Sequence, residues 1–360
     1  DNYAPNNVVL VLSGDIDAAT ARPMVEKWFA GIPRGPEVRK VEAGPVTLPA
    51  PVRREMKDQV PLTKVYRVWS GPGLNHADAP ALDMGMRVLG GLASSRLDNE
   101  LVRGRQLATS VSANVQQFEQ VSFIQVEMEI KPGVDQTQAE AALDALIADL
   151  VANGPTADEL QRAATSAVSG QIAGLEMVGG FGGKGATLAE GLLYSGDPAQ
   201  YRKDLAAIAA LTPRDVQAAL GRWLSRPVYA LVVSPGERTE RGETMGGWGD
   251  EASSASPKPD AKKPAPKLAK SPARALPPVA PVGELTFPRV EHAALSNGIP
   301  IVLARRTGVP KVLVNLSFDA GYAADAQDGP GTQSLMMSLL DEGTENLNAT
   351  QIAEEQERLG

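Results

Sequence analysis

Alternating apolar and polar side chains predict a β-strand over residues 121–131. Ile124, Val126, Met128 and Ile130 fall on one side of that stretch, and glutamine, glutamate and lysine residues fall on the other. Because successive side chains of a strand point to opposite faces, one face of the predicted sheet is buried and the other meets solvent. A sheet covered on one side is typical of antiparallel strands. The pattern therefore predicts an antiparallel sheet with one solvated face.

Helix-start signals and shorter apolar runs predict the other elements. Thr156 and Glu159 have the spacing of a capping box, Thr212 precedes a proline at a second helix start, and Asp17 is placed to cap a third helix over 17–30. Further strands are predicted at 8–12, 64–69, 228–233, 300–305 and 311–318. Further helices are predicted at 79–92, 95–107, 136–152, 331–341 and 349–359.

Two passages follow the same plan and indicate an internal repeat. Each begins with a strand, at 64–70 and at 311–317, and leads through a glycine and a stretch with Asp and Pro into a helix. A repeated unit explains this better than two unrelated folds. The predicted fold class is α+β, with repeated domains that each pack a mostly antiparallel sheet with helices.

Residues 237–284 are predicted to be an extended linker, rich in Pro, Lys and Ala. Six bases and a single acid lie between residues 258 and 274, whereas the whole chain has a net charge of −8. The remainder is therefore strongly acidic, which argues against nucleic acid as a partner. A spacer of this composition is semi-rigid and forms no core. We interpret it as a solvated spacer in preference to a polyanion-binding tail.

Composition excludes several kinds of site. The chain contains no cysteine and two histidines, which excludes disulfides, thiolate zinc sites and cysteine nucleophiles. His76 and His292 are far apart in sequence, and each is interpreted as a residue of a turn or connector rather than a metal ligand. The adjacent acids at 341–342 and 354–355 are interpreted as solvated helix faces rather than working carboxylate pairs. No apolar run approaches the roughly 18 residues that a membrane span requires.

A glycine-rich stretch matches a dinucleotide fingerprint in its letters alone. Gly180, Gly182 and Gly185 have the G-x-G-x-x-G spacing, but that fingerprint must follow a strand and open a helix. The stretch here lies between two predicted helices. We therefore interpret residues 179–191 as a flexible joint between helices.

The residues alone thus predict a repeat-built α+β fragment without a complete active site, but several motifs resemble the pitrilysin/insulinase family of zinc metallopeptidases. The run NVVLVLSGDID at 7–17 is similar to the close of that family's first domain, and LGGLASSRL at 89–97 is similar to its second domain. Similar stretches, in the same order as in the family, lie at 192–198, 211–216, 295–302, 318–322 and 342–344. The resemblance covers the chain outside the linker and implies metallopeptidase-like α+β domains.

The resemblance also implies where a zinc motif would fall. The family signature H-x-x-E-H places two imidazoles and a general-base glutamate on one helix face. Aligned on Gly331 and Gly343, its zinc-binding and catalytic positions are occupied by Ser334, Met337 and Ser338. Serine and methionine do not replace these groups. We therefore expect zinc in the parent protein and no metal, cofactor or catalytic residue in this segment.

A second family feature is an Arg and a Tyr, seven residues apart, that hold the substrate and the developing oxyanion. The corresponding positions are occupied by Val102 and Thr109. Arg103 is one place away and is not expected to compensate. Both losses imply that this copy of the domain is structural.

The resemblance implies four sections. Residues 1–44 correspond to the last strand and helix of a first, catalytic-type domain, and residues 45–236 to a complete, structural second domain. Residues 237–284 are the linker, and residues 285–360 start a third domain with a degenerate zinc motif. The chain begins at Asp1 with a strand-like run and no signal peptide, so we expect a segment whose zinc helix lies upstream.

The parent is expected to be a zinc-dependent peptidase that encloses and hydrolyses peptides, with this segment providing chamber wall and hinge while itself inactive. Its expected partners are a peptide or unfolded polypeptide substrate and the remaining domains of the same protein. A periplasmic or cell-envelope location follows from the fused family members. The first alternative is a non-catalytic structural or partner subunit of the same family. The second is a free-standing binding module.

Overall fold

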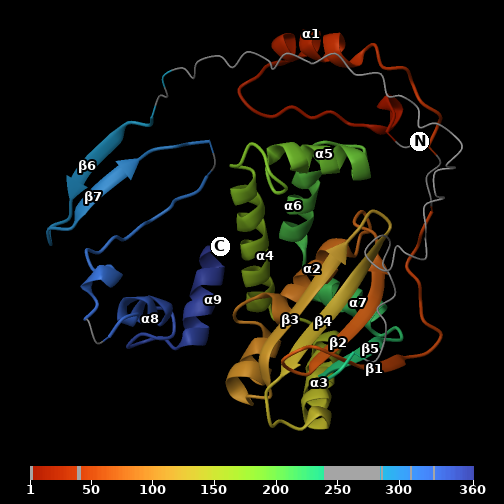
Figure 1. Ribbon diagram of the computed structural model, residues 1–360, viewed down its shortest axis with the longest axis vertical. Coiled ribbons are helices and arrows are strands. Elements are labelled where there is room, and N and C mark those ends of the chain that lie inside the picture. Colours follow the sequence, from red (N-terminus) through yellow and green to blue (C-terminus); the bar gives the residue numbers. More distant parts are fainter. Residues whose placement is uncertain (1–2, 39–41, 239–283, 285–286, 309, 327–328) are drawn as a thin grey trace, which may run out of the picture. The chain divides into compact units, whose positions relative to one another are not determined.

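The computed structural model describes all residues except 1–2, 39–41, 239–283, 285–286, 309 and 327–328 (Figure 1). The chain forms two compact units. One unit comprises Asp1–Arg238 together with Val309–Gly360, and the other comprises Thr239–Gly308. The predicted linker at 237–284 lies almost entirely outside the described residues.

A five-stranded sheet is the centre of the larger unit. Its strand order is β1-β5-β2-β4-β3. Neighbouring strands are antiparallel except for β1 and β5, which are parallel. The predicted α+β class with a mostly antiparallel sheet is therefore confirmed. The strands are β1 (Val52–Asp58), β2 (Lys64–Pro72), β3 (Ala108–Gln117), β4 (Val121–Ile130) and β5 (Tyr229–Pro235).

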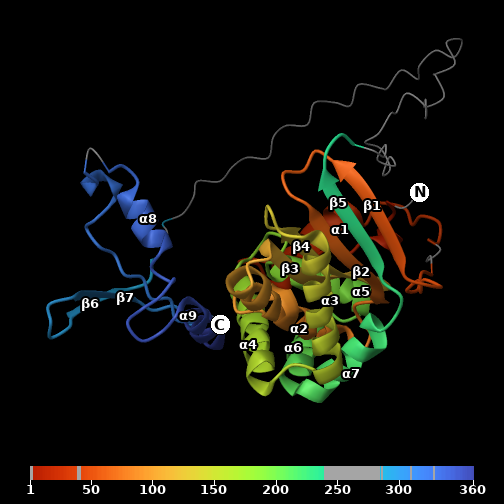
Figure 2. The same ribbon diagram turned by 90° about the horizontal axis from the view of Figure 1, so that it is seen from below.

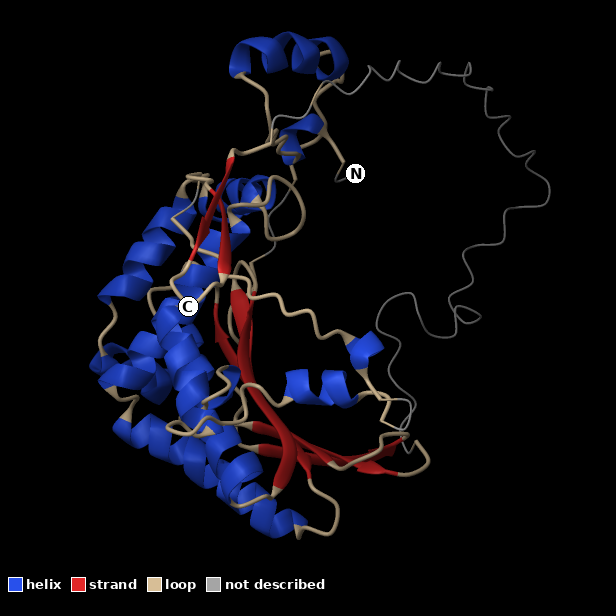
Figure 3. Ribbon diagram, turned by 90° about the vertical axis from the view of Figure 1, so that its left-hand side faces the viewer, coloured by secondary structure: helices blue, strands red, loops and turns tan. Residues whose placement is uncertain are grey.

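Helices cover one face of this sheet, as Figures 2 and 3 show. The capping boxes predicted at Thr156 and Thr212 are both formed, with Glu159 and Asp215 as their third-position partners. The α-helices between the strands are α2 (Ala79–Met86), α3 (Gln136–Asn153), α4 (Ala157–Gly174), α5 (Lys184–Ser195), α6 (Gln200–Ala210) and α7 (Pro213–Leu224). Two π-helical segments, η2 (Arg87–Gly91) and η3 (Asp98–Gly104), follow α2.

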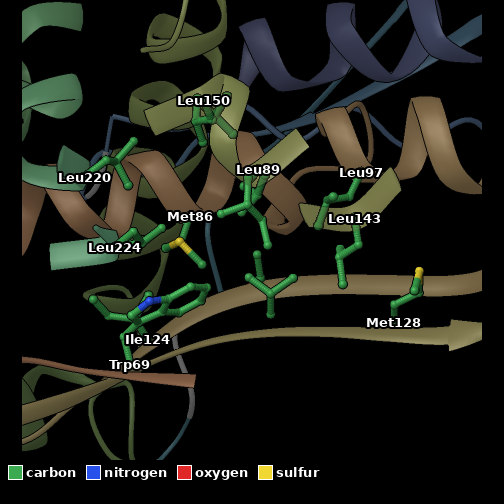
Figure 4. Close-up of a cluster of buried hydrophobic side chains, with 14 of the residues drawn as sticks. Trp69, Met86, Leu89, Leu97, Ile124, Met128, Leu143, Leu150, Leu220 and Leu224 are labelled. Atoms are coloured by element: carbon green, nitrogen blue, oxygen red, sulfur yellow. The ribbon is translucent and has the colours of Figure 1, made fainter. Parts of the chain in front are cut away.

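The core lies between the sheet and these helices (Figure 4). The predicted apolar face of β4 is buried, with Ile124, Val126 and Met128 fully inaccessible to solvent. Their contacts exclude water from the centre of the sheet, and burial of each such side chain contributes about 1.5–3 kcal/mol. The helices supply the other side of the core, including Met86, Leu89, Leu97, Leu143, Leu150, Leu220 and Leu224.

A buried ion-pair network connects the sheet to α3. Arg67 of β2 is 4% exposed and donates hydrogen bonds to Glu140 at 2.8 Å and to Asp144 at 2.9 and 3.0 Å. Arg53 of β1 also donates to Glu140, at 2.7 and 3.0 Å. Burial raises the pKa of Glu140, but hydrogen bonds from Arg53, Arg67 and Gln136 outweigh it and bring the pKa to about 2. Glu140 is therefore ionised at neutral pH.

Two predicted strands are absent, and three strands were missed. Residues 8–12 and 311–318 have extended-type sequences but form no strand, because no described strand lies beside either to accept its backbone hydrogen bonds. Without a strand at 311–318, the second passage of the predicted repeat lacks the strand that opens the first passage. The missed strands are β1, β3 and, after the linker, β6 (Val290–Ala294). The α-helix predicted over 95–107 is replaced by the shorter π-helical segment η3 at Asp98–Gly104.

The remaining elements are short. The helix α1 (Ala18–Phe29) begins as predicted at Asp17, whose side chain accepts a hydrogen bond from the Thr20 amide. A 3₁₀ turn, η1 (Pro5–Asn7), precedes it. After the linker come the hairpin of β6 (Val290–Ala294) and β7 (Pro300–Ala304) in the smaller unit, then η4 (Tyr322–Ala324), α8 (Thr332–Ser338) and α9 (Ala349–Leu359).

Among the described residues, no helix combines the length and the apolar content that a membrane crossing requires.

Candidate functional site

The sheet face opposite the core is only partly covered and is mostly polar. Along β2, the buried residues Val65, Arg67 and Trp69 alternate with Lys64, Tyr66, Val68 and Ser70, which are partly exposed. We call the face that carries the second set the open sheet face. On β4 it includes Phe123, Gln125, Glu127 and Glu129, and on β3 it includes Ser110, Ser112, Asn114 and Gln116.

A cluster of charged groups stands at one end of the open sheet face. The Lys64 Nζ lies 2.8 Å from Glu129 Oε1 and 3.3 Å from Glu127 Oε1, and the Tyr66 hydroxyl donates to Glu127 at 3.2 Å. Hydrogen bonding to Lys64 lowers the pKa of Glu129, and hydrogen bonds to Glu129 and Glu127 raise the pKa of Lys64. Burial raises the pKa of Tyr66. Neither shift brings Glu129 or Lys64 toward neutrality, so the cluster suits binding rather than acid–base catalysis.

The two edges of the sheet differ in charge. Five of the seven residues of β1 are charged, as is usual for an edge that must not pair with another chain. The other edge, β3, has ten residues and contains neither a charged residue nor a proline. Its protection is limited to a register shift between Ala108 and Ser110. Within the described part of the chain, no strand pairs with the outer side of β3.

One cavity opens beside the open sheet face, and a second lies beyond the end of β3 next to α4, α5 and α6. An apolar cavity of about 180 Å³ lies between residues 46–48 and the sheet, with Val46, Val68, Phe123 and Tyr229 in its lining. The Val46 amide donates to the Ser70 hydroxyl at 3.1 Å, which holds this extended segment against β2. A larger cavity of about 670 Å³ lies at the end of β3. Its lining includes Gln117, Phe118, Tyr194, Tyr201 and Asp204.

The positions of the degenerate zinc motif lie on α8. Ser334, Met337 and Ser338 are exposed, and the Ser338 hydroxyl donates to the Leu335 carbonyl at 2.8 Å. None of these side chains supplies the imidazole or carboxylate ligands that zinc requires, so the residues present do not fit the metal. Across the described ranges, no three His, Asp or Glu side chains come together to hold a metal ion. The absence of zinc from the segment stays a prediction.

The side chains at the positions of the Arg/Tyr pair make structural contacts. Val102 lies in η3 and packs against the core, and Thr109 is exposed near the start of β3, where its hydroxyl is 3.4 Å from the Glu129 carbonyl. Arg103 is held by Asp98 at 2.7 Å. Neither Val102 nor Thr109 supplies a cationic or phenolic group.

The histidines occupy separate environments. His76 Nδ1 accepts a hydrogen bond from the Asp78 amide at 3.0 Å, and its ring meets Trp223 edge-on at 5.7 Å. Asp78 also accepts from Trp223 Nε1 at 2.9 Å and pairs with Arg222. His76 therefore belongs to a turn that anchors α2 to α7. The prediction that His292 lies in a turn or connector is wrong, because it lies exposed on strand β6, paired with Val302 of β7 in the other unit.

The paired acids are on the surface, as predicted for solvated faces. Asp341 and Glu342 are exposed after α8. On α9, Glu355 is exposed, and Glu354 is partly exposed and lies 3.6 Å from Arg358.

The glycine-rich stretch joins two helices, as predicted, but α5 begins within it. It follows α4 rather than a strand, so the context of a dinucleotide fingerprint is missing. Lys184 opens α5, so Gly185 and Gly191 belong to a helix instead of a flexible joint. Gly180 has a positive φ of 84°, a conformation that glycine adopts at little cost.

The open sheet face and the β3 edge were not identified from the sequence as a site. The signal for β3 was present, because Val111, Ala113 and Val115 alternate with polar residues over 110–116. Recognising that alternation as a second strand would have placed a neutral strand next to β4.

Comparison with known proteins gives a family match for the N-terminal part of the chain and a likeness in fold. Residues 1–166 match the family model described as the peptidase M16 inactive domain. No curated protein matches the sequence. Among solved structures, the chain is similar to a peptidase M16 inactive domain from Pseudomonas fluorescens, with 21% identity, a TM-score of 0.56, and coverage of 67% of this chain and 56% of that one.

Two further solved structures share the fold. A protease from Helicobacter pylori is 18% identical, with a TM-score of 0.55 and coverage of 62% of this chain and 54% of that one. The periplasmic protease PqqL from Escherichia coli is 15% identical, with a TM-score of 0.51 and coverage of 62% of this chain and 25% of that one. The chain spans about half the length of the first two structures.

Proposed function

We propose that the chain is a non-catalytic segment of a peptidase M16 family member and that it holds extended polypeptide for a parent zinc peptidase, because residues 1–166 match the inactive domain of that family. The match agrees with the resemblance to pitrilysin/insulinase-type enzymes found in the sequence. The observation that carries the proposal is the neutral, unpaired edge strand β3 beside an open sheet face.

An extended polypeptide has the geometry to continue this sheet. Added next to β3, it would exchange backbone hydrogen bonds with the unpaired side of the strand, a mode that gives affinity with little dependence on sequence. Ser112, Asn114 and Gln116 would offer hydroxyl and amide groups to its side chains. The larger cavity at the end of β3 would supply space for a large side chain.

In the parent, this segment would form part of the wall of a chamber that encloses peptides. Residues 1–44 would complete a catalytic-type domain, residues 45–236 would form the wall, residues 237–284 would be the hinge, and residues 285–360 would start a third domain. The zinc site would belong to a part of the parent that precedes residue 1. The likeness of the fold to a periplasmic protease supports a periplasmic location for the parent.

Binding of an unfolded polypeptide tests the proposal. Dye-labelled, unfolded casein is titrated with the chain, and fluorescence anisotropy reports binding. Replacing Asn114 and Gln116 by lysine puts two charges on the β3 edge and is expected to weaken binding by at least about tenfold, because edge charges oppose pairing with a further strand. In the control variant, Thr137 and Gln138 of α3 are replaced by lysine. It carries the same added charge away from the sheet and should bind casein as tightly as the unsubstituted chain.

The outcomes separate this function from its alternative. Equal binding by the two double variants would refute a role for β3. Failure of the unchanged chain to bind casein would favour a structural or partner subunit, which needs no affinity for unfolded polypeptide.

A further inference from the structure

Three hydrogen-bond donors converge on one carboxylate at the surface of α4. The Ser94 amide donates to Glu357 Oε1 at 2.9 Å, and the Ser94 hydroxyl donates to Glu357 Oε2 at 2.5 Å. Arg162 donates to the same Oε2 at 2.6 Å. The side chains of Arg162 and Glu357 are 4% and 10% exposed, so the carboxylate is nearly enclosed. Glu357 belongs to α9, far along the chain from both donors.

The Arg162 donor is also held by a contact other than Glu357. Asp158, one helical turn before Arg162 on α4, accepts from Arg162 Nε at 2.9 Å and so orients the guanidinium. Arg162 also donates to the Ser94 hydroxyl, which aligns the two groups. A guanidinium buried to this extent is costly unless an anion pairs with it. Asp158 is one such anion, and Glu357 is a second one that the Ser94 amide and hydroxyl also bind.

Residues on either side of Glu357 also contact other parts of the larger unit, at spacings that suit an α-helix. Thr350 Oγ1 donates to Asn99 Oδ1 at 3.2 Å near the start of α9, and Arg358 Nη2 lies 3.0 Å from Asp158 Oδ1 near its end. Ala353, between them, is 7% exposed and is the buried residue of α9. Its small side chain allows α9 to lie close to α4.

We propose that Ser94 and Arg162 form a carboxylate dock that captures an acidic helix, and that its occupant is α9 of the same chain. The proposal does not rest on peptide binding by β3. Capture of Glu357 would hold α9 against α4 within the larger unit. Release of α9 from α4 would then require loss of the Glu357 contacts.

Hydrogen exchange measured by mass spectrometry on the full chain tests the dock. Glu357→Gln removes the charge-assisted hydrogen bonds that join α9 to Arg162 and Ser94, while Arg162 keeps its ion pair with Asp158, so exchange of the amides of residues 349–359 should accelerate about 100-fold. Glu355→Gln is the matched control. It lies on the same helix, its side chain is 58% exposed, and its ion pair is with Arg358. Its exchange should change less than about threefold, as expected for a surface pair.

A thiol cross-link identifies which copy supplies the helix. The chain has no cysteine, so Asn99→Cys with Thr350→Cys introduces a single pair of thiols. A short bifunctional thiol reagent should give a monomer whose two fragments remain joined after proteolysis in the linker. A cross-linked dimer would overturn the proposal that α9 comes from the same chain. No cross-link, or equal exchange in the Glu357→Gln and Glu355→Gln variants, would overturn the dock itself.

Discussion

Replacing Glu140 by glutamine removes the charge at the centre of the network that joins the sheet to α3. The side chain keeps nearly the same volume, but Arg53 and Arg67 lose an ionised partner, and Arg67 is 4% exposed. Hydrogen bonds from both arginines oppose the effect of burial and hold the pKa of Glu140 at about 2, against 4.5 for an unperturbed glutamate. At about 1.36 kcal/mol per pH unit, this difference corresponds to about 3 kcal/mol of folding free energy at pH 7.

The contribution has a defined pH dependence. Because the folded-state pKa lies below the unfolded-state value, the stabilisation is fully present above pH 4.5 and is lost as the pH falls toward 2. The free energies of unfolding of the parent chain and the Glu140→Gln variant should therefore differ by about 3 kcal/mol at pH 7 and by about 1 kcal/mol at pH 3. Below pH 2 the free energies of unfolding of the two proteins should be nearly equal.

Urea unfolding followed by tryptophan fluorescence measures the effect, since Trp69 and Trp223 are both 5% exposed in this unit. Glu55→Gln is the matched control, because Glu55 bonds the same Arg53 while its own side chain is 64% exposed. It should change stability by less than about 0.5 kcal/mol. A difference for Glu140→Gln below 1 kcal/mol at pH 7, or one that stays constant down to pH 3, would refute the reasoning.

Three further predictions concern stability, each measured by the same urea unfolding. Thr156→Ala should cost about 1 kcal/mol, because the α4 capping box is lost; no change would contradict this assignment. Leu220→Ala should cost about 2–5 kcal/mol, since Leu220 is fully buried, whereas Leu193→Ala at a half-exposed site should cost far less. Gly90→Ala should cost about 1–3 kcal/mol, because the added Cβ would lie 2.7 Å from the Ala113 amide nitrogen; unchanged stability would show that η2 shifts freely.

Local patterns predicted those elements whose stability is decided locally. The alternation at 121–131 identified β4, and the capping sequences at Thr156 and Thr212 located the starts of α4 and α7. The same reasoning failed where a partner decides the outcome. Residues 8–12 and 311–318 have strand-like sequences, but a strand forms only when another accepts its backbone hydrogen bonds.

The candidate site and the dock depend on distant parts of the sequence. The absence of charged residues from β3 is visible in the sequence. The position of β3 at an edge depends on the strand order of the sheet, which no local pattern reveals. Likewise, Ser94, Arg162 and Glu357 have no recognisable spacing in the sequence, because they come from a loop, α4 and α9 and meet only in the folded chain. The family resemblance supplied the positions of Val102 and Ser334, whereas the contacts of these residues required the structure.

The parallel pairing of the first and last strands has a mechanical consequence. Val52 is opposite Tyr229 and Asp58 is opposite Pro235, so the polypeptide enters at one end of this pair and leaves at the other. At about 3.3 Å per residue, the two points are about 20 Å apart along the strands. Tension between the flanking segments therefore loads the whole ladder in shear, and its bonds must break together rather than one after another. The folded section can transmit a pull to its neighbours without being unzipped by it.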